Sequence, residues 1–151
     1  MLYTFFRARP SWATLPKAEK AQAIAEFVAC LDDFKDRLTV RTYSTMGLRR
    51  DTDFLLWVIA PEMDAIQEFM VGLRGTAMAP HLENTYSYLA VTRESIYVKA
   101  HPGDEARVTM PSGQSKYLFV YPFVKTREWY LLPAEERRRM MAEHIRAGHK
   151  F

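Results

Sequence analysis

The sequence predicts an α+β fold made of ferredoxin-like repeats of the dimeric α/β-barrel type, with an antiparallel sheet covered by helices on one face. Two observations lead to this prediction. Residues 1–96 contain segments with the patterns strand, helix, strand, strand, helix, strand, which is the ferredoxin-like order. In addition, part of this unit recurs near the end of the chain after a shift of 117 positions, which indicates an internal repeat.

Four segments of the first unit are expected to be strands. Residues 2–6, 38–46 and 85–91 are rich in aromatic and β-branched residues and end at turn-forming or polar positions. The run at 54–59 is continuously apolar, which is typical of a strand that is covered on both faces.

Two helices are expected between these strands. Residues 15–34 carry apolar residues at helical spacing, and Pro16 suits a first helical turn. The expected inward residues of this helix are Ile24, Phe27, Val28, Leu31 and Phe34. A second helix is predicted from Met63, Ile66, Met70 and Leu73, and it should end near Gly72 or Gly75.

The rest of the chain predicts a connector and an incomplete second repeat. Residues 97–115 are rich in Pro, Gly and mixed charge and are interpreted as an extended connector. Residues 116–124 are expected to be a strand and 133–147 a helix, so 116–151 correspond to the first strand and helix of a second repeat. We expect the remaining strands to belong to a longer protein of which this chain is a truncated version. The alternatives are a second chain that completes the unit, or a protein of this length that has lost haem chemistry.

The repeat aligns particular residues of the two helices. The shift by 117 places Trp12 on Trp129, and Leu15-Pro16 on Leu132-Pro133. It also places Phe27, an expected core residue, on His144. His144 is therefore expected to face inward in the second repeat.

Composition narrows the class of protein. The 151 residues are 48% hydrophobic and 26% charged, as in an ordinary globular protein, and their net charge of +3 gives no nucleic-acid footprint. The single cysteine, Cys30, excludes an internal disulfide and fits a reducing compartment. No apolar run is long enough to span a membrane, so the expected location is the cytoplasm. The basic run Arg137–Arg139 is interpreted as a solvated helix face.

His144 is the candidate metal ligand. A lone helical histidine is more often solvated or hydrogen-bonded, but an inward imidazole needs a partner for each nitrogen, and a metal can be one. Met140 and Met141, one turn earlier, would form a soft apolar wall. No second ligand lies at zinc-like spacing, so a single axial ligand in apolar surroundings favours haem over zinc.

Tyr121 and Lys125 are candidates for the same site. Their spacing of four residues would place them on one face of an uninterrupted strand, although Pro122 lies between them. Taken alone, they are more simply interpreted as an edge-strand tyrosine and a solvated lysine. A haem cofactor that bears carboxylates would give each side chain a role, because the lysine can pair with a propionate and the phenol can be oxidised to a radical.

The segment 116–144 resembles the chlorite dismutase family, and its coproheme decarboxylase branch in particular. The resemblance rests on Tyr121-Pro-Phe-Val-Lys125, on Trp129, and on Met140-Met-Ala-Glu-His144, and it extends weakly over nearly the whole chain. It implies two ferredoxin-like repeats in each subunit and a homo-oligomer, with a pentamer favoured. It also implies haem b or coproheme III in the second repeat.

The resemblance further implies roles for five residues. His144 would be the proximal iron ligand, Tyr121 the radical-forming residue, Lys125 a propionate contact, and Trp129 a neighbour of the haem. Arg107, fourteen residues before Tyr121, would bind a second propionate or be a solvated connector residue.

The implied activity is the hydrogen-peroxide-dependent conversion of coproheme III to haem b. The alternatives are a chlorite dismutase, which converts chlorite to chloride and dioxygen, and a non-catalytic haem-binding or structural ferredoxin-like module. The family's distal residue, which best separates the two activities, would lie beyond residue 151.

Overall fold

The structure is a computed structural model, and it describes residues 1–91 and 117–150. By its internal contacts the chain divides into two compact units, Met1–Lys116 and Tyr117–Phe151. The connector expected at 97–115, together with Arg107, lies outside the described residues.

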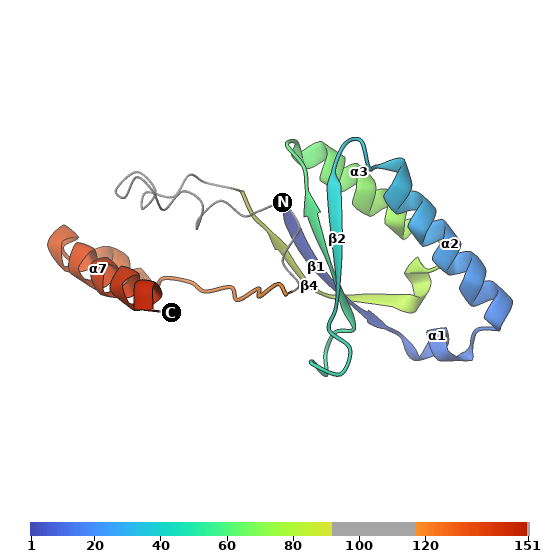
Figure 1. Ribbon diagram of the computed structural model, residues 1–151, viewed down its shortest axis with the longest axis horizontal. Coiled ribbons are helices and arrows are strands. Elements are labelled where there is room, and N and C mark those ends of the chain that lie inside the picture. The colour runs from blue at the N-terminus through green and yellow to red at the C-terminus, as the bar shows by residue number, and fades with distance from the viewer. Residues whose placement is uncertain (92–116, 151) are drawn as a thin grey trace. The chain divides into compact units, whose positions relative to one another are not determined.

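The first unit contains a four-stranded antiparallel sheet with the strand order β2-β3-β1-β4 (Figure 1). The strands are β1 (Leu2–Ala8), β2 (Thr39–Ser44), β3 (Phe54–Ile59) and β4 (Leu82–Leu89). β1 lies in the centre and pairs with β3 on one side and β4 on the other. This order, with a helical crossover after β1 and another after β3, confirms the predicted ferredoxin-like α+β fold.

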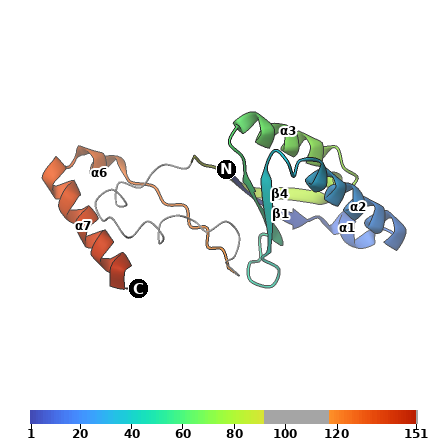
Figure 2. The same ribbon diagram turned by 45° about the horizontal axis from the view of Figure 1, so that its top comes forward.

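The helices of this unit lie on one face of the sheet (Figures 1 and 2). They are α1 (Pro10–Thr14), α2 (Lys17–Asp33), α3 (Met63–Arg74) and the short 3-10 helix η1 (Ala79–His81). Pro16 precedes α2 as its N-cap. α3 ends at Gly75, whose backbone N–H donates to the carbonyl oxygens of Val71 and Gly72. None of the helices in residues 1–91 and 117–150 is both long enough and apolar enough to cross a membrane.

The core lies between the helices and the sheet. Leu56 and Val58 of β3 and Phe69 of α3 are fully buried there. The four central residues of β3 are all buried, which confirms that this strand is covered on both faces. On the face away from the helices, the ring of Tyr3 stacks on that of Trp57, with 5.7 Å between their centroids.

The buried face of α2 differs from the prediction. Ala23 and Phe27 are buried, whereas Ile24 and Val28 are 46% and 47% exposed. The reason is geometric, because successive helical residues are rotated by about 100°. A stripe through 23, 27, 30, 31 and 34 meets the sheet, and Ile24 and Val28 lie beside that stripe.

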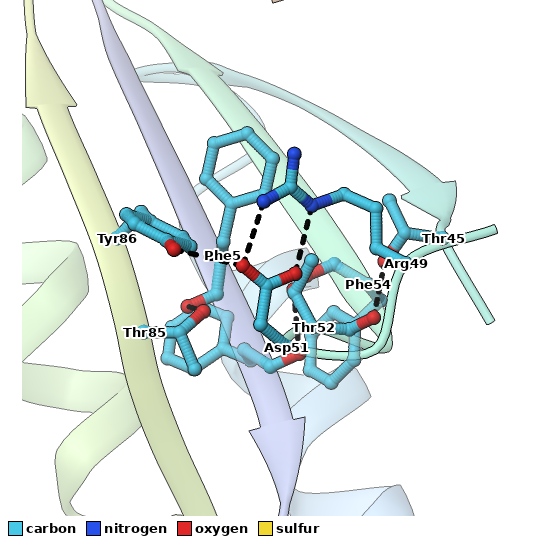
Figure 3. A network of polar contacts seen from close by, with 9 residues as sticks. Phe5, Thr45, Arg49, Asp51, Thr52, Phe54, Thr85 and Tyr86 are labelled. Carbon is cyan, nitrogen blue, oxygen red and sulfur yellow. Dashed lines mark hydrogen bonds and ion pairs between the residues drawn. The ribbon is translucent and has the colours of Figure 1, made fainter.

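Polar contacts fix the loop between β2 and β3 (Figure 3). The Asp51 carboxylate accepts two hydrogen bonds from Arg49, at 2.8 and 2.6 Å, and a third at 2.7 Å from the hydroxyl of Tyr86 on β4. These bonds, with those from Arg49 contributing most, hold the pKa of the Asp51 carboxyl well below its usual range. The Thr52 hydroxyl donates to the Phe6 carbonyl oxygen at 3.0 Å, so the loop is tied to β1 as well.

The second unit contains α6 (Arg127–Leu131) and α7 (Ala134–Lys150). Its helix was predicted at 133–147, but the strand expected at 116–124 is not formed over 117–124, where the backbone is neither helix nor strand. A strand exists through hydrogen bonds to a neighbouring strand. Residues 117–150 contain no other strand that could provide them.

The structure confirms the repeat of the helical segment. A shift by 117 carries the bounds of α1 onto those of α6 and the bounds of α2 onto those of α7. The turn between the helices is also repeated, because the N–H of Leu15 donates to the Trp12 carbonyl at 3.4 Å and that of Leu132 to the Trp129 carbonyl at the same distance. The two copies therefore have the same local backbone conformation.

Candidate functional site

One face of α7 carries three of the residues that could form a site. Arg137, Met141 and His144 are spaced by four and three residues, which places them along the same side of an α-helix. Met140, the other residue expected to flank His144, lies four residues before it and therefore on the same side of the helix, and its counterpart in the repeat is the buried Ala23. A ligand that binds at His144 would therefore meet the thioethers of Met140 and Met141 one turn earlier.

The segment before α7 folds back onto this face. The ammonium nitrogen of Lys125 lies 3.7 Å from the Sδ atom of Met141 and 4.0 Å from the centroid of the Trp129 ring. The guanidinium carbon of Arg137 lies 5.6 Å from the same ring. Trp129 thus interacts with two cations through its π-face, an arrangement that fixes the indole relative to α7.

The repeat indicates the direction in which His144 faces. Its counterpart Phe27 is 9% exposed and packs edge-on against Phe54 of β3, with 6.3 Å between ring centroids. In residues 117–150 no sheet lies beneath α7, and His144 is accordingly exposed. The imidazole is thus on the helix face that in the first unit packs against the sheet.

Tyr121 is separate from this cluster. Its side chain is 76% exposed, and its ring stacks on that of Phe123 at 6.4 Å between centroids. The expected proximity to Lys125 depended on an uninterrupted strand, which residues 117–126 do not form. The structure therefore brings Lys125 and Trp129 together, whereas Tyr121 pairs with Phe123 and His144 lies farther along α7.

Arg137 was missed by the sequence-based interpretation. The run Arg137–Arg139 was expected to be a solvated face, but Arg137 is half-buried and its Nε atom is buried without a hydrogen-bond partner. Its spacing of seven residues from His144, about two helical turns, could have placed Arg137 on the same side of the helix from the sequence alone. The Arg137 guanidinium, over the Trp129 ring, adds a second positive charge to this face of α7.

The donor set fits an iron porphyrin better than a bare metal ion. The described residues contain no cluster of three or more His, Cys, Asp or Glu side chains that could hold a metal. One imidazole, two cations and exposed aromatic side chains suit a flat apolar group with one axial position and peripheral carboxylates. Within residues 117–150 the exposed aromatic residues are Tyr117, Phe119, Tyr121, Phe123 and Tyr130.

Comparisons with known proteins found similar sequences. Residues 20–151 match the family model described as chlorite dismutase. The chain is 31% identical over 157 aligned positions to the coproheme decarboxylase of Mycolicibacterium smegmatis, and the match covers 100% of this chain and 64% of that protein.

Solved structures give the same result. A chlorite dismutase variant from Candidatus Nitrospira defluvii superposes with a TM-score of 0.84 at 27% identity, covering 97% of this chain and 63% of that one. A haem-binding protein from Thermus thermophilus gives a TM-score of 0.65 at 22% identity, covering 99% of this chain and 65% of that one, a likeness of fold alone. The chain spans less than two thirds of the length of each of these relatives.

Proposed function

Because the chain belongs to the chlorite dismutase family, we propose that it binds coproheme III through His144 and converts it to haem b with hydrogen peroxide. The observation that carries this proposal is the cluster of Lys125, Trp129 and Met141 on the α7 face that also bears His144. The proposal includes the division into a repeat at 1–96, a connector at 97–115 and a haem-binding repeat at 116–151. It also includes a homo-oligomer, a pentamer in particular.

His144 holds the metal in this proposal. A neutral imidazole nitrogen is a good axial ligand, and α7 fixes its position relative to Met141 and Arg137. When bound, the porphyrin iron supplies the redox chemistry, and the protein supplies ligation and orientation. Met141 and Trp129 provide the apolar contacts beside the ligated imidazole.

Lys125 orients the substrate. Its ammonium group interacts with the Trp129 ring and the Met141 sulfur, and none of the described carboxylates pairs with it. It can therefore donate to a propionate, and a charge-assisted bond of this kind is stronger than a neutral one. The Arg137 guanidinium is a further positive charge on the same face, and Arg107 is proposed to bind a second propionate.

Tyr121 moves the hydrogen atom. For each propionate, one hydrogen peroxide is reduced to two waters while the side chain loses carbon dioxide and two hydrogen atoms and becomes a vinyl group. The Tyr121 phenol would give up an electron to the peroxide, together with its hydroxyl proton, and the resulting radical would remove a hydrogen atom from the propionate and so restore the phenol. Loss of a second electron to the same peroxide, and of the carboxyl proton, would then release carbon dioxide and leave the vinyl group. The exposed position of Tyr121 in this segment leaves its ring accessible to a substrate held by Lys125 and His144.

The test compares Tyr121→Phe with Tyr130→Phe, an exposed tyrosine in α6 that the proposal does not use. Each purified chain is mixed with ferric coproheme and then with hydrogen peroxide, and the porphyrin is analysed by mass spectrometry. The parent and Tyr130→Phe should form mono- and divinyl products, and Tyr121→Phe should retain coproheme. Vinyl products from Tyr121→Phe at the parent rate would remove Tyr121 from the mechanism.

The structural likeness to chlorite dismutase favours a second candidate activity, the conversion of chlorite to chloride and dioxygen. The same haem-loaded chain, given chlorite in an oxygen-electrode cell, separates the two. Oxygen release without vinyl products would assign the dismutase activity. Haem binding with neither product would assign a non-catalytic haem-binding module.

A further inference from the structure

The first unit contains a cavity that the proposed haem chemistry does not use. It has a volume of about 220 Å³ and lies between the sheet and the helices α2 and α3. Its apolar wall comes from two strands and two helices. The residues of this wall are Phe6, Phe27, Met70, Leu73 and Leu82.

Two arginines line the same cavity, and none of the Asp and Glu residues within 1–91 and 117–150 does. The Nε atom of Arg9 donates to the Leu82 carbonyl oxygen at 3.1 Å, which leaves the terminal guanidinium nitrogens of Arg9 free to bind an anion. Arg74, in the last turn of α3, has no carboxylate partner among the described residues. Asn84 adds an amide to the lining.

Three arginines of this unit, Arg7, Arg37 and Arg49, form ion pairs with Glu83, Glu68 and Asp51, whereas Arg41 and Arg50 form none among the described residues. What distinguishes the two guanidinium groups at the cavity is that they border apolar space without a carboxylate from the described residues beside them. An anion that also carries an apolar body would satisfy both features, since its carboxylate pairs with arginine while its tail leaves water.

The repeat explains why this cavity takes no metal. Phe27, which lines it, occupies the position that His144 occupies in the second unit. A phenyl ring has no donor for iron, so the helix–sheet space of the first unit offers apolar contact where the second offers an imidazole. The volume is also below the roughly 300–1,000 Å³ of pockets for drug-sized ligands, which excludes a porphyrin.

We propose that this cavity is a binding site for a short apolar monocarboxylate, whose carboxylate is held by Arg9 and Arg74 and whose chain lies against Phe27 and Leu73. The site is independent of haem binding, because each of its lining residues belongs to the first unit. Octanoate is a suitable probe, since it combines one carboxylate with an unbranched apolar chain.

The test is isothermal titration calorimetry of the full chain with octanoate, with octylammonium as the probe of opposite charge. Octanoate should bind with a dissociation constant of about 1 mM or below, and octylammonium should not bind. Arg74→Gln and Arg9→Gln should each weaken octanoate binding about tenfold, which corresponds to about 1.4 kcal/mol. The matched control is Arg50→Gln, an exposed arginine outside the cavity, which should bind like the parent.

A second variant tests the cavity without altering charge. Ala79→Leu should fill the space from η1 and abolish binding while the far-UV circular dichroism spectrum stays that of the parent. The proposal is overturned if octanoate does not bind the folded parent. It is also overturned if both arginine variants and Ala79→Leu bind octanoate as the parent does, or if octylammonium binds equally well.

Discussion

Phe27 and His144 provide a direct test of the repeat. They occupy equivalent positions in the two copies, but Phe27 is a core residue and His144 is a proposed ligand. Phe27→Ala removes a ring that is 9% exposed and packs edge-on against Phe54 in the core of the first unit. His144→Ala removes a side chain that is exposed. The same substitution at equivalent positions should therefore have very different effects on stability.

The expected magnitude follows from the burial of the ring. Truncation of a buried phenylalanine to alanine costs about 3–5 kcal/mol, which combines lost transfer free energy with the void left behind. Phe27 already borders a cavity of about 220 Å³, so it lacks protein contacts on that side. We therefore expect the lower end, about 3 kcal/mol, or a fall of about 6–12 °C in melting temperature. His144→Ala should change the unfolding free energy by less than about 0.5 kcal/mol.

The assay is urea unfolding of the apo protein, followed by far-UV circular dichroism, with the slope of the transition compared between variants. A fall of less than about 1 kcal/mol for Phe27→Ala would refute the assignment of Phe27 to the core. An equal loss for His144→Ala would contradict the view that this position became a ligand site in the second unit.

Two further predictions concern the first unit. Because bonds from Arg49 and Tyr86 lower the folded-state pKa of Asp51, the stabilisation by its carboxylate is present above the unfolded pKa of about 3.9 and is lost as the pH falls toward the folded value. Asp51→Asn should therefore have a lower melting temperature than the parent at neutral pH, and the two melting temperatures should lie closer together in strong acid. The same difference in melting temperature at both pH values would contradict this prediction. A Cβ atom added at Gly72 would lie 3.1 Å from the Sγ atom of Cys30, which is a tight contact. Replacement of a helical glycine by alanine usually stabilises a protein by about 0.5–1 kcal/mol. Gly72→Ala should therefore raise the free energy of unfolding by this amount only when Cys30 has also been replaced by alanine. Equal effects of Gly72→Ala in the two backgrounds, measured by thermal unfolding, would exclude that contact as the cause.

Much of the first unit could be predicted because its signals are local. The apolar run at 54–59 and the helical spacing of Met63, Ile66 and Leu73 indicate their elements without knowledge of neighbours. The identical spacing of Trp and Leu-Pro in two parts of the chain indicated the repeat. In the structure both copies form the same hydrogen bond from the Leu N–H to the Trp carbonyl. The inward face of α2 was harder, because periodicity marks the apolar residues of a helix and does not say which of them meet the sheet. Ile24 and Val28 are exposed for that reason.

The candidate site was predictable in its residue types and less so in its contacts. A strand at 117–124 requires a pairing partner that local sequence cannot provide, and without it Tyr121 stacks on Phe123 and not beside Lys125. The interaction of Lys125 with Trp129 and the half-burial of Arg137 depend on how the segment before α7 folds back. That fold-back joins Lys125 to Met141, sixteen positions later, and a pattern of residue types does not reveal such a contact.

The central claim is that His144 is the iron ligand, and a titration of ferric coproheme into the apo protein tests it most directly. The Soret spectrum of the parent is compared with those of His144→Ala and His81→Ala, a histidine of the first unit that contacts Ser11. The account predicts the same ligated spectrum for the parent and His81→Ala, and loss of that spectrum in His144→Ala. An unchanged spectrum in His144→Ala would contradict it.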